Sequence, residues 1–250
     1  MADPSRKERT GAFFDVDGTL VKGFIIQSFP RFLMRKGLIN ADFSERIDSI
    51  VYEYNAGRTT YRSAAESVPT LYASALQGLS YEEVRHCAKE FMMAYVPENI
   101  FPFAKELVGR IGDIVDFVVA VSGSPVEVVS ELDLGFDRIY GTVLEVRNGA
   151  YTGIVLSNLI LGETKAEFAR EICDDLRLDA ARSMAFGDTD QDVPLLSIVG
   201  CPVAINPNKP LHDICTSKNW TILSDQDLKH LDTTVERLSR VVNNSSLLDS

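Results

Sequence analysis

The hydrophobic pattern of the chain alternates between short apolar runs and longer segments in which apolar positions recur at helical spacing. The apolar runs predict buried strands at residues 11–15, 116–121, 137–140, 183–186, 201–205 and 221–223. The segments between them predict helices at residues 103–111, from about 125, at 164–176, shortly after Asp188 and after 206–207. Because strands and helices alternate, the sequence predicts an α/β fold, with a parallel sheet covered by helices on both faces.

A helical block interrupts this alternation directly after the first strand. Its periodicity predicts helices at residues 25–35, 42–54, 60–76 and 81–95. Glycines separate these helices and prolines close the block, at Gly37, Gly57, Gly78, Pro97 and Pro102. We therefore expect a separate helical cap, inserted into the sheet domain.

The predicted division of the chain has three parts. The core comprises residues 1–21 and 103–225, the cap residues 22–102, and a C-terminal helical tail residues 226–250. Within the core, residues 143–155 predict a hairpin whose turn is Asn148-Gly149, a strong turn signal. From Ser224 onward we expect an exposed helix, frayed over residues 243–250.

Composition excludes several classes of protein. The chain has 250 residues, with 45% apolar and 24% charged, which is ordinary for a globular protein. Its formal charge of −11 argues against a nucleic-acid partner, although a small anionic substrate needs only a local cation. No apolar run is long enough to cross a bilayer, and the N-terminus lacks the apolar region of a secretory signal. These features predict a soluble, cytoplasmic enzyme without a membrane partner, and they leave the oligomeric state open.

The four cysteines are spaced far apart and form no CxxC pair, at Cys87, Cys173, Cys201 and Cys215. We interpret them as buried thiols in a reducing compartment. Together with three isolated histidines, they give no sign of a zinc site.

Four polar segments fall where the predicted sheet would bring them together. They are Asp15-Val-Asp-Gly-Thr19, Ser122-Gly-Ser124, Lys165 and Gly187-Asp-Thr-Asp-Gln-Asp192. In an open parallel sheet, ligands bind outside the carboxyl ends of the strands. Taken singly, an acidic loop could be a surface turn or a calcium-binding turn, and a lone lysine a solvated side chain. Taken together, the four segments indicate one site.

Acids and a single lysine suit phosphoryl transfer. A carboxylate that attacks a phosphate monoester meets a repulsion of about 8 kcal/mol at ~4 Å and an effective dielectric of ~20. A divalent cation offsets this charge, and carboxylate ligands favour Mg²⁺. We therefore expect a phosphatase for a small phosphorylated metabolite, with Mg²⁺ as its cofactor.

The acids can be given separate roles. Asp15 is the candidate nucleophile, and Asp17 the candidate general acid and base. Asp188 and Asp192 are candidate metal ligands, and we count Asp15 and Asp17 in the same metal-binding set.

The remaining polar residues of these segments are candidates for binding the phosphoryl group. They are Thr19, Ser122, Gly123 and Lys165, of which Ser122 and the Gly123 amide can donate hydrogen bonds to its oxygens. Lys165 supplies the only positive charge of the four segments.

These segments resemble, in order, the four motifs of the haloacid-dehalogenase-like phosphohydrolases. The resemblance covers residues 12–205, and residues 200–207 resemble the phosphoserine-phosphatase-like branch. It implies a Rossmann-like core, an inserted C1-type helical cap, Mg²⁺ and an aspartyl-phosphate intermediate on Asp15. Dehalogenases of this superfamily lack the second acid, so Asp17 favours phosphoryl transfer.

We predict a substrate specificity that differs from that of the phosphoserine-phosphatase-like branch. Phosphoserine phosphatases carry an acid near the position of Phe24, which binds the substrate ammonium group, and a phenyl ring offers at most a cation–π face. Lys22 and Phe24 follow the catalytic loop and are candidates for its entrance, whereas Arg58 and Arg62 could bind a substrate carboxylate or remain solvated. We therefore do not expect strict phosphoserine specificity.

Three other functions compete with a phosphatase. A phosphomutase would use the same intermediate with a sugar hydroxyl as acceptor. A non-catalytic binding protein could keep the fold but would not need Asp17. A phospho-receiver domain would have no use for the cap.

Overall fold

The computed structural model describes residues 9–244 of the chain. Seven strands form one sheet in the order β4-β3-β2-β1-β5-β6-β7. All neighbouring pairs are parallel except the β3–β4 pair, which is antiparallel. The strands are β1 (Gly11–Phe14), β2 (Phe117–Pro125), β3 (Arg138–Arg147), β4 (Ala150–Ser157), β5 (Met184–Gly187), β6 (Cys201–Ile205) and β7 (Thr221–Leu223). The predicted α/β class and its parallel sheet are confirmed.

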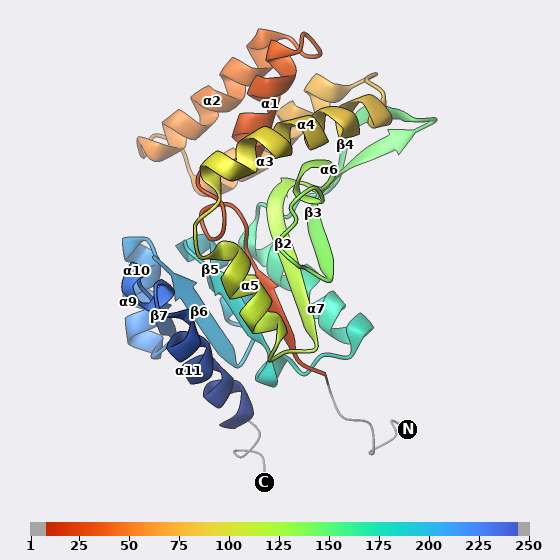
Figure 1. Cartoon of the computed structure of the whole chain (residues 1–250). Helices are drawn as coiled ribbons and strands as arrows, with labels where there is room; N and C mark the ends of the chain where they lie inside the picture. The colour runs from red at the N-terminus through yellow and green to blue at the C-terminus, as the bar shows by residue number, and fades with distance from the viewer. Residues whose placement is uncertain (1–8, 245–250) are drawn as a thin grey trace.

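Helices pack on both faces of this sheet (Figure 1). Successive residues of β1 point to opposite faces, so Phe13 and Phe14 enter two different apolar clusters. Phe13 packs with α7 (Gly162–Leu176), α8 (Val193–Leu196) and α9 (Lys209–Lys218). Phe14 belongs to the cluster that includes α5 (Ala104–Gly112) and α11 (Leu231–Asn244). A strand covered on both faces needs apolar residues at every position, which explains the continuous apolar run of β1.

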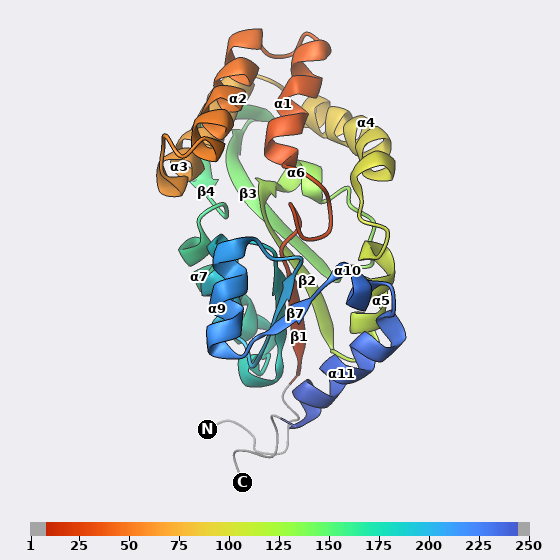
Figure 2. The ribbon, with the colours of Figure 1, turned by 90° about the vertical axis from the view of Figure 1, so that its left-hand side faces the viewer.

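The inserted helices form the predicted cap. They are α1 (Ile25–Arg35), α2 (Ala41–Asn55), α3 (Tyr61–Leu76) and α4 (Tyr81–Asn99). Figures 1 and 2 show them together at the end of the sheet where the β3–β4 hairpin extends alongside them. Their shared interior contains the fully buried rings of Phe29 and Tyr72, and Phe29 also packs on Phe91 with ring centroids 5.3 Å apart. The apolar interior of the cap is continuous with the cluster that contains Phe14 of the core.

The predicted hairpin forms, but it begins earlier than expected. Residues 137–140 and 143–155 were predicted as a strand and a separate hairpin, whereas β3 runs without a break from Arg138 to Arg147. Its first half pairs with β2 and its second half with β4, so one long strand serves two partners. The hairpin also reaches the cap, where the Gly78 amide donates to the Tyr151 carbonyl at 2.9 Å.

Two further predictions are wrong in detail. The strand predicted at residues 116–121 does not end there but continues through Ser122-Gly-Ser124 to Pro125, with a register shift against β3 between Val121 and Pro125. The helix expected from Pro125 is a single turn, α6 (Val126–Val129). The regular ladder with β3 is interrupted after Val121, so Ser122, Gly123 and Ser124 lie in the irregular carboxyl end of β2.

The C-terminal tail is helical as predicted, but it is not an exposed helix. After α10 (Asp225–Leu228), α11 lies beside α5 (Figure 2) and buries one apolar side. Its buried residues include Leu231, Val235, Leu238 and Val242. Their spacing of three and four residues is the period of an amphipathic helix, which the sequence carried and our interpretation missed. The fraying expected for residues 243–250 falls almost wholly outside the described residues.

The remaining expectations concern cysteines and membranes. All four cysteines are buried free thiols, as predicted. Within residues 9–244, no helix is both long enough and apolar enough to span a bilayer.

Candidate active site

The site lies at the carboxyl edge of three adjacent strands. The central strand β1 ends at Phe14, and the Asp15 amide extends its ladder by donating to the Phe186 carbonyl of β5 at 2.9 Å. The rings of Phe14 and Phe186 stack with centroids 4.1 Å apart, which fixes the ends of these two strands relative to each other. Since β1 and β5 are parallel, Asp15 and Asp188 emerge at the same edge.

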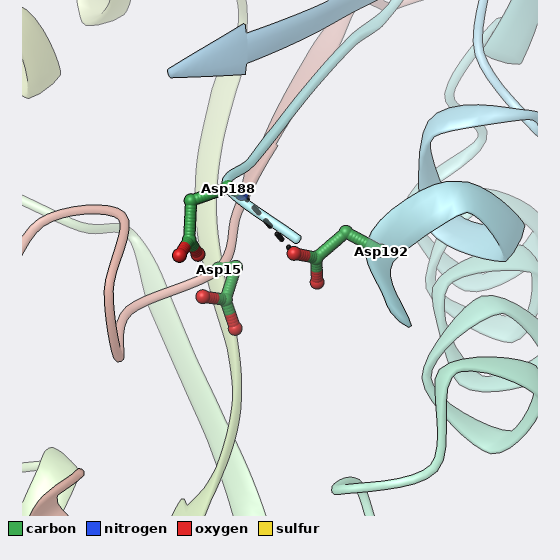
Figure 3. Close-up of side chains that lie close together, drawn as sticks. All are labelled: Asp15, Asp188 and Asp192. Carbon is green, nitrogen blue, oxygen red and sulfur yellow. Dashed lines mark hydrogen bonds between the residues drawn. The ribbon is translucent and has the colours of Figure 1, made fainter. Parts of the chain in front are cut away.

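Three carboxylates converge at this edge. Asp15, Asp188 and Asp192 each offer an oxygen, and these oxygens lie within 4.8 Å of one another. Figure 3 shows the three side chains turned toward a common centre. Thr19 Oγ lies 3.1 Å from Asp15 Oδ2 and 2.9 Å from Asp188 Oδ1, so its one proton can serve either acid. The structure thus brings together acids from distant parts of the chain.

Asp192 is held mainly by backbone amides. Its Oδ2 accepts hydrogen bonds from the amides of Asp188 and Thr189, at 3.2 and 3.1 Å. It closes the short helix η2 (Asp190–Asp192), and Gly187 lies so close that a Cβ there would meet the Asp192 Cβ at 2.5 Å. These contacts fix Asp192 beside Asp188.

Lys165 provides the positive charge. It lies in the first turns of α7, and its Nζ is 2.6 Å from Asp15 Oδ1 and 3.1 Å from Asp192 Oδ1. All three side chains are buried. Burial lowers the pKa of Lys165, but the charges of Asp15 and Asp192 outweigh it and raise the pKa above its ordinary value. Lys165 is therefore a permanent cation inside the acid cluster.

Asp17 does not join the three clustered acids. Its Oδ1 accepts a hydrogen bond from the Ile25 amide at the start of α1, at 2.7 Å. Its Oδ2 accepts from Ser122 Oγ at 3.0 Å. We had grouped Asp17 with the metal-binding acids, whereas in this structure its carboxylate faces the cap and the end of β2.

Ser122 and Gly123 stand where the sequence placed them, next to the acids. Ser122 Oγ accepts from the Ser124 amide at 3.0 Å while it donates to Asp17. Gly123 has Ile160 against its α-carbon, because a Cβ there would meet the Ile160 Cα at 3.0 Å. A side chain at position 123 would therefore push on the segment that leads into α7 and Lys165.

Burial raises the pKa of the acids. It is the largest cause for Asp15, whose pKa is well above its ordinary value although Lys165 lowers it. It also raises the pKa of Asp17, against hydrogen bonds led by the Ile25 amide. For Asp188, burial followed by the charge of Asp192 raises the pKa to about 7. Burial thus disfavours the charged form of each acid, and a cation bound beside them would favour it.

A hard divalent cation fits this arrangement. With all groups ionised, three carboxylates and one ammonium leave two uncompensated negative charges. The donors are oxygens, the ligand type of Mg²⁺, and opposite ligands of Mg²⁺ at ~2.1 Å lie about 4.2 Å apart. The separation of up to 4.8 Å is close to this value, so small rotations of the carboxylates suffice. Asp15, Asp188 and Asp192 would hold the ion.

The two cap arginines proposed as ligands for a substrate carboxylate form ion pairs with glutamates. Arg58 forms two hydrogen bonds to Glu53, at 2.6 and 2.9 Å. Arg62 lies 3.5 Å from Glu163, an ion pair between the cap and α7. Neither guanidinium is brought to the acid cluster by a contact in the structure.

Sequence reasoning missed two contributors to the site. Ser124 Oγ accepts from the Ile26 amide at 3.1 Å, which ties α1 to β2. Tyr61 of α3 donates a hydrogen bond to the Ile160 carbonyl. Ser124 lay inside a motif that the sequence singled out, whereas nothing in the local sequence of Tyr61 showed that α3 would contact residues 158–163.

Comparison with known proteins identifies the family. The family model described as haloacid dehalogenase-like hydrolase matches residues 12–197, which is most of the chain. The Inhibition of morphological differentiation protein of Streptomyces azureus is 30% identical over 218 residues, covering 86% of this chain and 78% of that protein. Histidinol-phosphatase of Neisseria meningitidis serogroup C is 27% identical over 221 residues, covering 85% of this chain and 97% of that enzyme.

A solved structure supports the same fold. The phospho-aspartyl intermediate analogue of phosphoserine phosphatase superimposes with a TM-score of 0.61, at 21% identity, over 90% of this chain and 99% of that one. The fold, the order of the motifs and the acid cluster agree with the family match, and the predicted resemblance is confirmed. The chain belongs to the haloacid dehalogenase-like hydrolases.

Proposed function

We propose that this protein is a Mg²⁺-dependent phosphatase that hydrolyses a small phosphate monoester through a phosphoryl group carried by Asp15. The observation that carries the proposal is the cluster of Asp15, Asp188 and Asp192, of which Asp15 and Asp192 are buried and both contact Lys165. A fold needs no such concentration of buried charge, since ion pairs of this kind stabilise little by themselves. The relative named histidinol-phosphatase supports the same class of reaction.

Asp15 is the residue placed for nucleophilic attack. It directly follows the central strand, and Lys165 and Thr19 each contact a different one of its two oxygens. These contacts fix the carboxylate, so that one oxygen can attack the phosphorus atom while the ester oxygen departs. Mg²⁺, when bound, offsets the negative charge that otherwise opposes this approach.

Asp17 is the residue placed to move the proton. Burial raises its pKa, which is the direction a general acid needs near neutral pH. In the first step its proton passes to the departing ester oxygen. In the second step its carboxylate takes a proton from water, the water oxygen attacks phosphorus, and Asp15 is released together with inorganic phosphate. Ser122, which donates to Asp17, orients that carboxyl group.

The cap and the cellular setting complete the proposal. We assign residues 22–102 as a cap that opens for the substrate and closes before attack. The Ile25 amide, which donates to Asp17, connects the cap to the general acid. Four buried free cysteines support a cytoplasmic setting, and the charge of −11 supports a small metabolite in preference to a nucleic acid.

The test is phosphate release from a panel of phosphorylated metabolites, with Mg²⁺ and after its removal by a chelator. We expect stoichiometric inorganic phosphate with Mg²⁺, loss on chelation, and recovery when Mg²⁺ is restored. The Asp15→Asn variant should fold and bind but not turn over. Isomerised phosphosugar in place of free phosphate would establish a phosphomutase instead, and full activity of Asp15→Asn would exclude the proposed nucleophile.

A further inference from the structure

Four aromatic residues in or directly before the cap helices have no part in the proposed chemistry and lie outside the fully buried interior of the cap. Phe24 directly precedes α1, and Tyr54, Tyr61 and Tyr95 belong to α2, α3 and α4. We refer to these four residues as the cap aromatics. Their contacts, taken one by one, connect each of them to the residues around the acid cluster.

Tyr61 reaches the core beside the phosphate-binding residues. Its hydroxyl donates to the Ile160 carbonyl, and Ile160 lies against the α-carbon of Gly123. Burial raises the pKa of Tyr61, and the nearby Lys165 ammonium acts against that rise. Through Ile160, Tyr61 is therefore connected to the Ser122-Gly123 segment of the site.

Tyr54 continues the aromatic surface from Tyr61. The two rings meet edge to face, with centroids 5.7 Å apart and planes at 63°. Burial raises the pKa of Tyr54, with a smaller contribution from Asp190 in the loop of the acid cluster. Two helices of the cap thus present adjoining rings, one of which contacts the segment that leads into α7.

Phe24 and Tyr95 lie on the side of the general acid. Phe24 is 44% exposed, and the amide of the next residue, Ile25, donates to Asp17. Tyr95 donates to the Lys22 carbonyl at 2.9 Å, within the same connection between core and cap. The cap aromatics therefore flank both the phosphate-binding residues and the acid that protonates the departing oxygen.

The polar groups of this surface are already engaged. The hydroxyls of Tyr61 and Tyr95 donate to backbone carbonyls, and the Tyr95 ring also stacks on Phe91, which holds both rings in place. Arginines of the cap pair with acids, as in the Arg31–Asp48 and Arg58–Glu53 pairs. Fixed rings favour another flat ring, by stacking or edge-to-face contact, and offer little to a charged group that needs a matched ion.

We infer that the cap aromatics select phosphate monoesters whose leaving group carries a flat, uncharged ring. The inference rests on the proposed phosphatase activity and narrows its substrate class. It separates this chain from an enzyme specific for phosphoserine, whose leaving group is small and zwitterionic.

The first experiment compares three esters of primary alcohols with the Mg²⁺-loaded enzyme: benzyl phosphate, cyclohexylmethyl phosphate and O-phosphoserine. All three have alkoxide leaving groups, which limits differences in intrinsic reactivity. We expect kcat/KM for benzyl phosphate to exceed that for O-phosphoserine at least about tenfold, the value of two ring contacts. Benzyl phosphate should also exceed cyclohexylmethyl phosphate about threefold, because the saturated ring is apolar but not flat.

The second experiment removes one ring. In Tyr61→Leu, the ratio of kcat/KM for benzyl phosphate to that for cyclohexylmethyl phosphate should fall about threefold, toward unity. A ratio of two substrates cancels any general loss of folded or active enzyme. Tyr52→Leu is the matched control, since Tyr52 is an aromatic residue of the same cap but is 64% exposed, and it should leave the ratio unchanged.

The outcomes separate this inference from the function beneath it. Phosphate release with O-phosphoserine as the preferred substrate, or an unchanged ratio in Tyr61→Leu, would overturn the aromatic selection and leave the phosphatase standing. No phosphate from any ester or metabolite in the panel would overturn both.

Discussion

The Lys165 ammonium lies 2.6 Å from Oδ1 of Asp15, and both groups are buried. The same ammonium is 3.1 Å from Asp192, so one cation holds an acid that follows β1 and an acid of η2. Replacing Lys165 would leave these acids buried without their partner, and a buried charge without a partner is costly.

We therefore expect Lys165→Met to lower the free energy of unfolding by about 3 kcal/mol without Mg²⁺. Added Mg²⁺ should raise the melting temperature of this variant more than that of the wild type, because the ion compensates the same carboxylates. Turnover should be lost. Lys209→Met is the control, since the Lys209–Asp213 pair is exposed and contributes little. Equal responses of wild type and Lys165→Met to Mg²⁺ would argue against a shared site.

Asp17→Asn tests the proton transfer. The amide oxygen can still accept from Ile25, so the fold should be kept. For benzyl phosphate, whose departing alkoxide needs a proton, we expect kcat to fall about 10²–10⁴-fold. For an aryl phosphate with an acidic phenol, the loss in the first step should be much smaller. Rapid-quench kinetics on the two esters measures this difference, and equal losses of the first-step rate would speak against Asp17 as the acid.

Gly18→Ala tests the crowding of the catalytic loop. Gly18 has φ of +90°, and a Cβ there would meet Asp188 Oδ2 at 2.4 Å. Gly57→Ala is a matched control, with φ of +69° and nothing within 4 Å of the added atom. Both variants should pay about 1 kcal/mol of backbone strain, but only Gly18→Ala should displace Asp188 and lose most of its activity. Comparable kcat values for the two variants would contradict the close approach.

Glu127→Gln tests a buried acid outside the site. Glu127 of α6 is 5% exposed and accepts from the Tyr72 hydroxyl at 2.9 Å, which links the core to the cap. Burial raises its pKa. The folded state thus holds the proton to higher pH than the unfolded state. The contribution of Glu127 to stability is present at pH values below its pKa in the unfolded chain. It is lost as the pH rises through its higher pKa in the folded protein.

The amide of Glu127→Gln cannot ionise, so the stability of the variant relative to the wild type should increase from about pH 4 upward and then level off. Urea unfolding of both proteins across this range gives the difference directly. A difference that does not change with pH would show that Glu127 ionises equally in the folded and unfolded states.

Leu238→Ala tests the packing of α11. Leu238 is fully buried in the cluster shared with α5, so its truncation should cost about 2–5 kcal/mol. The kcat of the folded fraction should be unchanged, because α11 lies away from the acid cluster. Chemical denaturation measures the first quantity and turnover per folded molecule the second. A loss below about 1 kcal/mol would mean that the tail helix is dispensable.

The sequence predicted the elements of the fold because their patterns are local. The apolar run at β1 and the helical spacing of α1–α4 can be recognised without knowing what packs against them. The convergence of Asp15 and Asp188 followed from the parallel sheet alone. The predictions that failed concern elements whose extent depends on a packing partner. β3 continues past Tyr140 because it pairs first with β2 and then with β4. α11 is covered because α5 lies beside it.

The site shows the same division. Residues in the motifs were placed correctly at one edge, but the orientation of Asp17 depends on the Ile25 amide and Ser122, which only the folded chain brings together. Tyr61 was missed for a similar reason, because its contact with Ile160 spans 99 positions of sequence. Local patterns indicate which residues reach the site, whereas long-range contacts decide how they face one another.

The most direct test of the account is reductive trapping of the enzyme during turnover. Acid quenching followed by borohydride converts an aspartyl phosphate to homoserine, which peptide mass spectrometry can locate. We predict homoserine at position 15 only when substrate and Mg²⁺ are both present. Steady release of phosphate with Asp15 unmodified, or modification at a different acid, would contradict the central claim that Asp15 carries the phosphoryl group.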